Sequence, residues 1–431
     1  MNHKAPGMTI KPAKQRLLSP SEWLLLGVLA AVQFTHMVDF VIMMPLGPKL
    51  IKQMDLTPGQ FGHLVSAYSL SAGIAGIASA RFLDRFDRKW VLLVLYSGFG
   101  LSTMLCAVAN TYELLVTARA VAGAFGGVAA SVVLAIVGDA FADARRGTAM
   151  GVIMLAFSLA TIVGIPIGIE LAERYDWHAP FQWLAVASAL VLCLGIAVLP
   201  PLRRHMSDKH CRDVNLIGLA RDPNHLRAFA LTAAICLGSF TVYPFLATYL
   251  VANVGLKLQQ LKTMYIVGGL TTILTVPLVG RLSDKYGKLP MFRILAGMTV
   301  VSLLLVTNIP PGVGLPIVII ATTFMMVVTT GRMVPATALI TSTAVPAERG
   351  GFMSLNAAVQ NLIAGFSADL SGWILNQSAH ASVHEEAAPL IGFAKVGVIA
   401  ALFTFSSLWF AGHLRPAVGG DLAPDEPPIP L

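Results

Sequence analysis

Among the charged residues within long apolar stretches of this sequence are one aspartate and two arginines whose types suggest proton chemistry. Asp39 and Arg119 each lie five residues from one end of an apolar run, and Arg332 lies inside a third run. A charge within a membrane-spanning segment costs about 2.5–3.5 kcal/mol on insertion scales, so such a residue usually has a function. Burial raises the pKa of a carboxyl group and a neighbouring arginine lowers it, so Asp39 could alternate between charged and neutral forms. The alternative is a fixed ion pair that only holds helices together.

The composition indicates the elements that position these charges. Of the 431 residues, 56% are hydrophobic and 12% are charged, about half the charged fraction of a soluble protein. A large soluble enzyme and a disordered chain are both excluded. The long continuous runs also lack the alternation of a membrane β-barrel. Helices of about 20 residues are therefore expected to cross the membrane. The twelve apolar runs cover 23–44, 62–82, 90–108, 114–137, 148–171, 181–198, 228–251, 264–282, 294–308, 314–343, 352–375 and 391–414.

The distribution of basic residues predicts the orientation. With the N-terminus in the cytoplasm, 22 of the 30 Lys and Arg residues fall on the inner side, as the positive-inside rule requires. Both termini are then cytoplasmic, and we expect the inner membrane of a bacterial-type cell. The predicted organisation is an N-terminal tail (1–22), a six-helix bundle (23–199), a basic cytoplasmic linker (200–227), a second six-helix bundle (228–414) and a disordered cytoplasmic tail (415–431).

An internal repeat relates the two halves. The pattern D-[RK]-[FY]-x-[RK] begins at Asp84 and again at Asp284, an offset of 200 residues (284 − 84). The pair Arg146-Gly147 recurs as Arg349-Gly350, an offset of 203 (349 − 146). Two matches at nearly the same offset indicate a duplicated six-helix unit. Such pseudo-symmetry places a central cavity between the halves, near the bilayer midplane.

These motifs resemble those of the major facilitator superfamily. Residues 80–89, ARFLDRFDRK, resemble its loop signature G-x-L-A-D-R-x-G-R-[RK], with departures at Ala80 and Asp87; residues 280–288 resemble it more closely. The stretch 119–123 resembles the R-x-x-x-G signature, and 39–45 resembles the D-x₅-P pattern of many exporters. The resemblance implies an all-α membrane protein with twelve helices in two pseudo-symmetric bundles.

One further element favours the drug:H⁺ antiporter and sugar-efflux branch. Gly164, Pro166 and Gly168 resemble its G-P-x-x-G element, with one residue inserted between Gly and Pro. We expect these three residues and Gly123 to allow close helix packing.

In this fold spans one and four line the cavity, so Asp39 and Arg119 are expected to face one another and to couple transport to protons. His36 is a minor candidate for a proton relay, since its reference pKa is near 6.5; a structural role is the alternative. The expected substrate contacts are Gln33, Tyr68, Tyr243, Arg332, Asn356, Gln360 and Asn361. Interhelical hydrogen bonding is an equal alternative for the last three. Two buried arginines favour an anionic or zwitterionic substrate.

The loop signature resembles a conformational latch that holds the cytoplasmic faces together. Ion pairs that form in one state and break in the other would bias the exchange. The alternative is that the charges of this loop only determine the membrane topology. The latch residues predicted are Asp84, Arg85, Arg88, Asp139, Arg146, Asp284 and Arg349.

The sequence predicts a proton-coupled secondary exporter of a small organic molecule. A symporter or facilitator that imports a sugar, amino acid or organic acid is the alternative. An enzyme or sensor is disfavoured, because G-x-S-x-G, H-E-x-x-H and G-x-x-x-x-G-K-[ST] are absent. We expect no cofactor and no metal site, and the proton gradient would be the energy source. The expected partners are lipid and a small molecule, and no nucleic acid is expected to bind. A monomer is expected.

Overall fold

The computed structural model describes residues 19–79, 85–141, 143–203, 216–345, 348–379 and 390–417, and these are helical apart from short connections. The N-terminal half contains α1 (Pro20–Gln53), α2 (Pro58–Ser79), α3 (Arg88–Ala107), α4 (Tyr112–Ala140), α5 (Asp143–Leu159), the π-helical turn η2 (Ala160–Gly164), α6 (Ile165–Arg174) and α7 (Ala179–Val198). The C-terminal half contains α8 (Leu216–Arg221), α9 (Pro223–Phe240), α10 (Tyr243–Ala252), α11 (Leu258–Tyr286), α12 (Lys288–Val306), α13 (Leu315–Thr341), α14 (Arg349–Ala379) and α15 (Phe393–Gly412).

The expected all-helical membrane fold is confirmed, and each predicted apolar run coincides with a helix or a broken helix. Eleven spans among the described residues are long and apolar enough to cross a membrane. The twelfth is α14, which has 31 residues. It is less apolar because Asn356, Asn361, Asp369 and Asn376 lie along it. Its main partner is α2 of the other bundle, so protein rather than lipid covers much of it.

Local capping groups decide where several helices begin. Ser19 and Glu22 form a capping box at the start of α1, which satisfies backbone amides of its first turn. The Asp222 carboxylate accepts hydrogen bonds from the Asn224 and His225 amides, so the seventh span begins at Pro223. That start is five residues before the predicted boundary at 228. The short helix α8 also lies within the predicted 200–227 linker. Residues 204–215 of that linker and most of both tails fall outside the described residues.

Two spans are interrupted near their middle. The fifth span passes from α5 through η2 into α6, and a π-helical turn of this kind often marks a functional site. The seventh span breaks between α9 and α10, where Thr241 and Val242 leave the helical pattern. The backbone oxygen of Thr241 accepts a 2.7 Å hydrogen bond from Ser371 of α14. That hydrogen bond lies within the C-terminal half. The η2 turn contacts α11, and α10 contacts α1, so both breaks adjoin the interface between the two halves.

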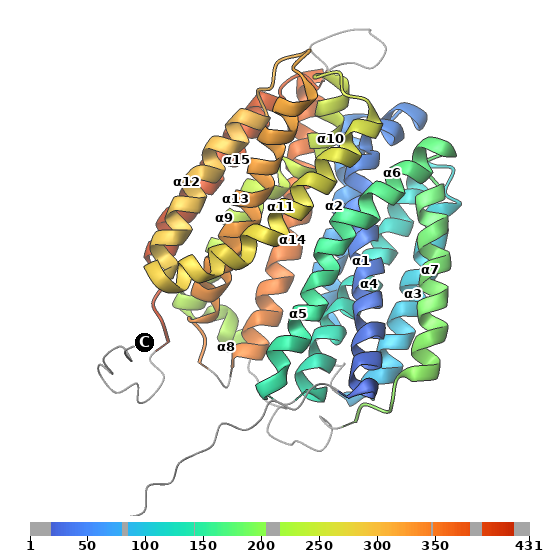
Figure 1. Ribbon diagram of the computed structural model, residues 1–431, viewed down its shortest axis with the longest axis vertical. Coiled ribbons are helices and arrows are strands. Elements are labelled where there is room, and N and C mark those ends of the chain that lie inside the picture. Colours follow the sequence, from blue (N-terminus) through green and yellow to red (C-terminus); the bar gives the residue numbers. More distant parts are fainter. Residues whose placement is uncertain are drawn as a thin grey trace, which may run out of the picture.

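Figure 1 shows the blue-to-green N-terminal bundle beside the yellow-to-red C-terminal bundle, with both ends of the described chain at the bottom. We call that end proximal and the opposite end distal. The bundles meet through α2 with α14, α1 with α10, and α6 with α11. At the distal end the Phe61 and Phe245 rings are 5.4 Å apart, and a Cβ atom on Gly62 would lie 2.9 Å from the Ala368 oxygen. Toward the proximal end α11 runs away from α5 (Figure 1), so the bundles are closed distally.

Candidate functional site

The centre of the N-terminal bundle holds a buried ion pair. Arg119 Nη1 of α4 lies 2.7 Å from Asp39 Oδ2 of α1 and donates a second, 3.2 Å hydrogen bond to the Asp39 backbone oxygen. The side chains are 0% and 1% exposed for Asp39 and Arg119, respectively. The structure thus brings together the two charges that the sequence placed at similar depth. Removing two charges from water is expensive, so the loss of either charge is costly to the other.

Tyr68 of α2 covers the other face of the arginine. The Arg119 guanidinium carbon lies 4.4 Å from the centre of the Tyr68 ring, within the range of a cation–π interaction. Thr103 of α3 donates a longer, 3.5 Å hydrogen bond to Asp39. Arg119 therefore has two contacts, the Asp39 backbone oxygen and the Tyr68 ring, that persist when the carboxyl group is neutral.

Three polar side chains near this pair have buried atoms with no hydrogen-bond partner among the described residues. They are the Gln33 amide oxygen, both ring nitrogens of His36 and the Tyr68 hydroxyl. The His36 and Tyr68 ring centres are 6.1 Å apart. A Cβ atom on Gly126 would lie 2.8 Å from both His36 Cδ2 and the Tyr68 hydroxyl, so these groups converge on α4. A buried polar atom without a partner costs free energy, so this cluster is a feature that folding alone would not select.

The predicted C-terminal cluster is not assembled as expected. Arg332 of α13 is fully buried and donates hydrogen bonds to the Ser239 hydroxyl at 2.6 Å, the Ile235 oxygen at 3.1 Å and the Thr404 hydroxyl at 3.4 Å. These partners belong to α9 and α15. The Ile235 oxygen and Ser239 lie at the C-terminal end of α9, where the helix dipole favours a cation.

Asn356 instead accepts a 2.6 Å hydrogen bond from Thr232 of α9, which matches its interhelical alternative. Gln360 and Asn361 are half-buried, and no hydrogen bond joins either of them to Arg332 in the described part of the chain. Tyr243 hydrogen-bonds to Thr329 over 2.5 Å. Asp39 pairs with one of the two buried arginines, and α9 and α15 engage the other. The preference for an anionic or zwitterionic substrate therefore stays a prediction.

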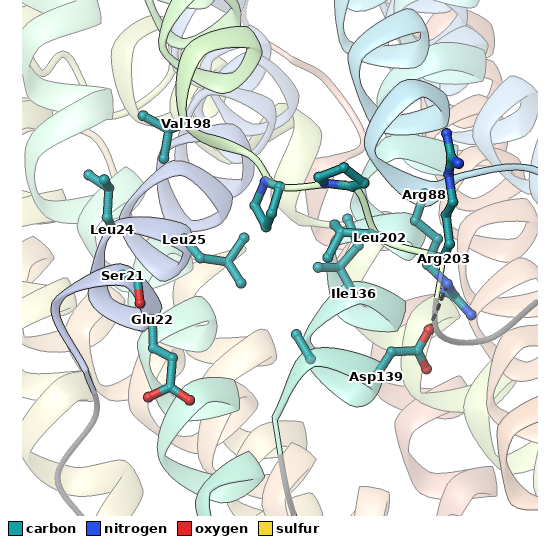
Figure 2. Close-up of a pocket in the computed structure, with 13 residues that line it drawn as sticks. Ser21, Glu22, Leu24, Leu25, Arg88, Ile136, Asp139, Val198, Leu202 and Arg203 are labelled. Carbon is teal, nitrogen blue, oxygen red and sulfur yellow. Dashed lines mark ion pairs between the residues drawn. The ribbon is translucent and has the colours of Figure 1, made fainter.

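The proximal end of the N-terminal bundle contains part of the predicted latch. Arg88 Nε lies 2.8 Å from Asp139 Oδ2. Figure 2 shows this pair beside a cavity of about 420 Å³ that Glu22 and Arg203 also line. Arg88 and Asp139 lie on α3 and α4 of the same bundle, so their ion pair cannot by itself lock the two bundles together.

The other predicted latch residues belong to the proximal ends of both halves. Asp84 lies outside the described residues. Arg85 and Arg146 are exposed on the N-terminal bundle. Asp284 and Arg349 are exposed on the C-terminal bundle, and neither forms an ion pair within the described part of the chain.

Asp87, where the sequence departs from the family signature, has a structural role. Its carboxylate caps α3 and accepts hydrogen bonds from the Lys89 and Leu202 amides and from Arg203. Burial alone would raise the Asp87 pKa, but these hydrogen bonds and the Arg203 charge hold it below its usual value. Gly287, at the matching position of the second repeat, has a φ of +94° that favours glycine. The two repeats thus use different turns here.

The predicted packing residues lie at close helix contacts. A Cβ atom on Gly123 would meet the backbone oxygen of Tyr68. Gly164 and Gly168 leave space for Val38 and Ile42 of α1. Pro166 stands at the start of α6, directly after the helical turn η2, so its missing N–H leaves a carbonyl of the preceding turn without its usual helical partner. These positions bring α2 and α6 against the helices that carry the ion pair.

The sequence reasoning missed ion pairs between the bundles at the distal end. His63 Nδ1 of α2 lies 2.6 Å from Asp369 Oδ1 of α14. Lys262 of α11 pairs with Glu170 and, at 3.0 Å, with Glu173 on the other bundle. Basic and acidic residues at the matching ends of spans two and eleven, and of spans five and eight, were a usable signal. The count of basic residues by membrane side used Lys262 only to assign topology and did not ask which carboxylate it could meet.

Two helical bundles that meet at an interface with broken helices are typical of a transporter. The Major Facilitator Superfamily model matches residues 29–214 and 228–428. The chain belongs to the Major Facilitator Superfamily, and the family match indicates a transporter and not an enzyme.

Comparisons with individual proteins agree with this family. The chain is 26% identical over 356 residues to "Uncharacterized MFS-type transporter YceJ" of Bacillus subtilis, covering 81% of this chain and 89% of that protein. It is 22% identical over 294 residues to a "Probable sugar efflux transporter" of Mannheimia succiniciproducens, covering 68% and 72%. The crystal structure of a bacterial homolog of the human lysosomal transporter Spinster, inward-facing and unoccupied, has a TM-score of 0.75 and 15% identity. That comparison covers 93% of this chain and 100% of the other, and it shows the fold.

Proposed function

We propose that this transporter exports a small organic molecule in exchange for protons by alternating access. The observation that carries the proposal is the Asp39–Arg119 pair, fully buried and joined over 2.7 Å. Buried ionisable groups in membrane spans are costly and typically mark ion pathways. A carboxylate can carry a proton, so the proton gradient would be the energy source without a cofactor.

The geometry suggests how protonation would act on the bundle. A proton on Asp39 cancels its charge and removes the ionic attraction between α1 and α4. Arg119 stays charged and keeps the Asp39 backbone oxygen and the Tyr68 ring as partners. Because α1 also contacts α10 and α4 contacts α2, a change between α1 and α4 reaches the interface of the two bundles. Proton binding would thereby bias which side of the interface is open.

Two further properties complete the proposal. The excess of basic residues at the proximal end favours a cytoplasmic location of both termini in an inner membrane, and the distally closed state would then face inward. A monomer suffices, since both bundles that form the site come from one chain. A relative named as a probable sugar efflux transporter supports export and a small-molecule substrate.

Inside-out membrane vesicles test the direction and the proton coupling together. Respiration acidifies the vesicle lumen, and a panel of monosaccharides, amino acids, carboxylic acids and antibiotics is added outside. An antiporter that takes up one of these compounds releases protons and raises the lumen pH. A symporter carries protons inward with the compound and lowers that pH, and a facilitator leaves it unchanged.

The Asp39→Asn variant tests in the same assay whether Asp39 carries the coupled proton. We expect it to bind the identified compound but to produce no pH change, because Asn cannot carry a proton. If Asp39→Asn retains transport driven by the pH gradient, the proposal fails. Vesicles without the transporter control for passive movement of each compound.

A further inference from the structure

The inter-bundle ion pairs at the distal end follow the internal repeat. His63 and Lys262 are 199 residues apart (262 − 63), and Glu170 and Asp369 are also 199 apart (369 − 170). This offset matches the sequence landmarks at 200 and 203. In each half, a basic residue at the distal start of the second span meets a carboxylate at the distal end of the fifth span of the other half. The two contacts are therefore equivalent positions of one pseudo-symmetric arrangement.

We propose that these five residues, His63, Asp369, Lys262, Glu170 and Glu173, form a two-point clasp that holds the distal face closed. Each point joins helices of different bundles, unlike the Arg88–Asp139 pair. Ser66 supports the first point by donating a 2.8 Å hydrogen bond to Asp369. At the second point, Glu173 lies 3.0 Å from Lys262, so one ammonium serves two carboxylates. This distal clasp rests on the alternating-access part of the proposed function.

The surrounding packing explains why the clasp has to break for the distal side to open. Beside the first point, the Gly62 and Gly372 backbones are in close contact, and Phe61 packs edge-on against Phe245. The clasp residues are partly exposed, with Lys262 at 18% and His63 at 59%. Solvent screens such pairs, and each contributes little compared with a buried pair. Clasp pairs of this strength can be broken and remade during each transport cycle.

Spin-label distances between the distal ends test the clasp without substrate or proton gradient. The four cysteines are changed to Ser, and labels are placed through Lys52→Cys on α1 and Gln259→Cys on α11, both exposed. His63→Gln and Lys262→Gln should each raise the ratio of distally open to closed molecules about two- to five-fold. The double variant should show roughly the product of the two changes, because the points are separate.

Matched controls exist in the same distal region. Arg174→Gln removes a cation that pairs with Glu170 within α6, and His178→Gln removes a histidine that pairs with Asp176 within the N-terminal bundle. Neither pair crosses the bundles, so both variants should leave the distance distribution unchanged. If they open the distal side as much as the clasp variants, or if the clasp variants leave it unchanged, the proposal is overturned.

Charge-reversal variants distinguish the loss of an ionic contact from a folding defect in the single variants. Lys262→Glu should open the distal side more than Lys262→Gln, and adding Glu170→Lys and Glu173→Lys should restore closure. Failure of the triple variant to restore it, in a protein with unchanged thermal stability, contradicts an ionic clasp. The proton-coupling assay is independent of this result, so the clasp and the proposed antiport can fail separately.

Discussion

Arg119 Nη1 lies 2.7 Å from Asp39 Oδ2, and this ion pair joins two helices at a depth where neither side chain reaches solvent. Each residue therefore depends on the other for its stability. Asp39→Asn leaves a buried guanidinium without a counter-charge, and we expect a loss of about 3–5 kcal/mol in stability. Adding Arg119→Gln removes the unpaired charge and should recover most of that loss. Thermal unfolding of the purified variants in detergent measures both effects. A double variant no more stable than Asp39→Asn would contradict this account of the pair.

The Arg332–Ser239 contact makes a second prediction about stability. Ser239→Ala leaves one guanidinium donor with only the Ile235 oxygen, and we expect a cost of about 1–3 kcal/mol because a buried donor loses its partner. Arg332→Met combined with Ser239→Ala removes both partners and should be closer to the wild type than Ser239→Ala alone. Thermal unfolding again provides the comparison. If Ser239→Ala has the stability of the wild type, the Arg332–Ser239 contact does not contribute to stability.

Two glycines of α4 provide a matched test of helix packing. Gly123→Ala would force a methyl group into the backbone of Tyr68, whereas a methyl group on Gly138 would have nothing within 4 Å of it. We expect Gly123→Ala to lose at least about 1–3 kcal/mol through overpacking. Gly138→Ala should instead gain up to about 1 kcal/mol from helix propensity. The yield and melting temperature of the two variants distinguish these outcomes, and equal behaviour would refute the close approach of α2 and α4.

The Asp87 cap predicts a pH dependence of stability. Hydrogen bonds and Arg203 hold the Asp87 pKa below its usual value in the folded protein. Its contribution is therefore fully present above the unfolded-state pKa of about 3.9 and is lost as pH falls through the folded-state pKa. Asp87→Ala should cost about 0.5–2 kcal/mol near pH 7 through loss of the cap.

Melting temperatures of wild type and Asp87→Ala, compared from pH 7 down to pH 3, check this dependence. The difference between them should shrink below about pH 4, as the carboxyl of the wild type becomes protonated. A difference that stays constant over this range would mean that Asp87 acts without its charge.

The sequence alone was sufficient for the spans, the repeat and the meeting of Asp39 with Arg119. Runs of about 20 apolar residues have to be helical in lipid, because backbone groups find no other hydrogen-bond partners there. Counting residues from the ends of such runs gives depth directly, at about 1.5 Å per residue. Two opposite charges at equal depth in neighbouring spans are expected to pair, since an unpaired charge in the membrane has a large free-energy cost.

Tertiary structure was needed to decide the direction in which each side chain points. Arg332 lies in a predicted span, yet only helix packing turned it toward Ser239 and away from Asn356. His63 and Asp369 likewise met only because α2 crosses α14 at the distal end. A membrane helix is apolar toward lipid and toward protein alike, so its sequence carries no amphipathic stripe to fix its rotation. That rotation is set by close contacts with neighbouring helices, which the linear sequence does not display.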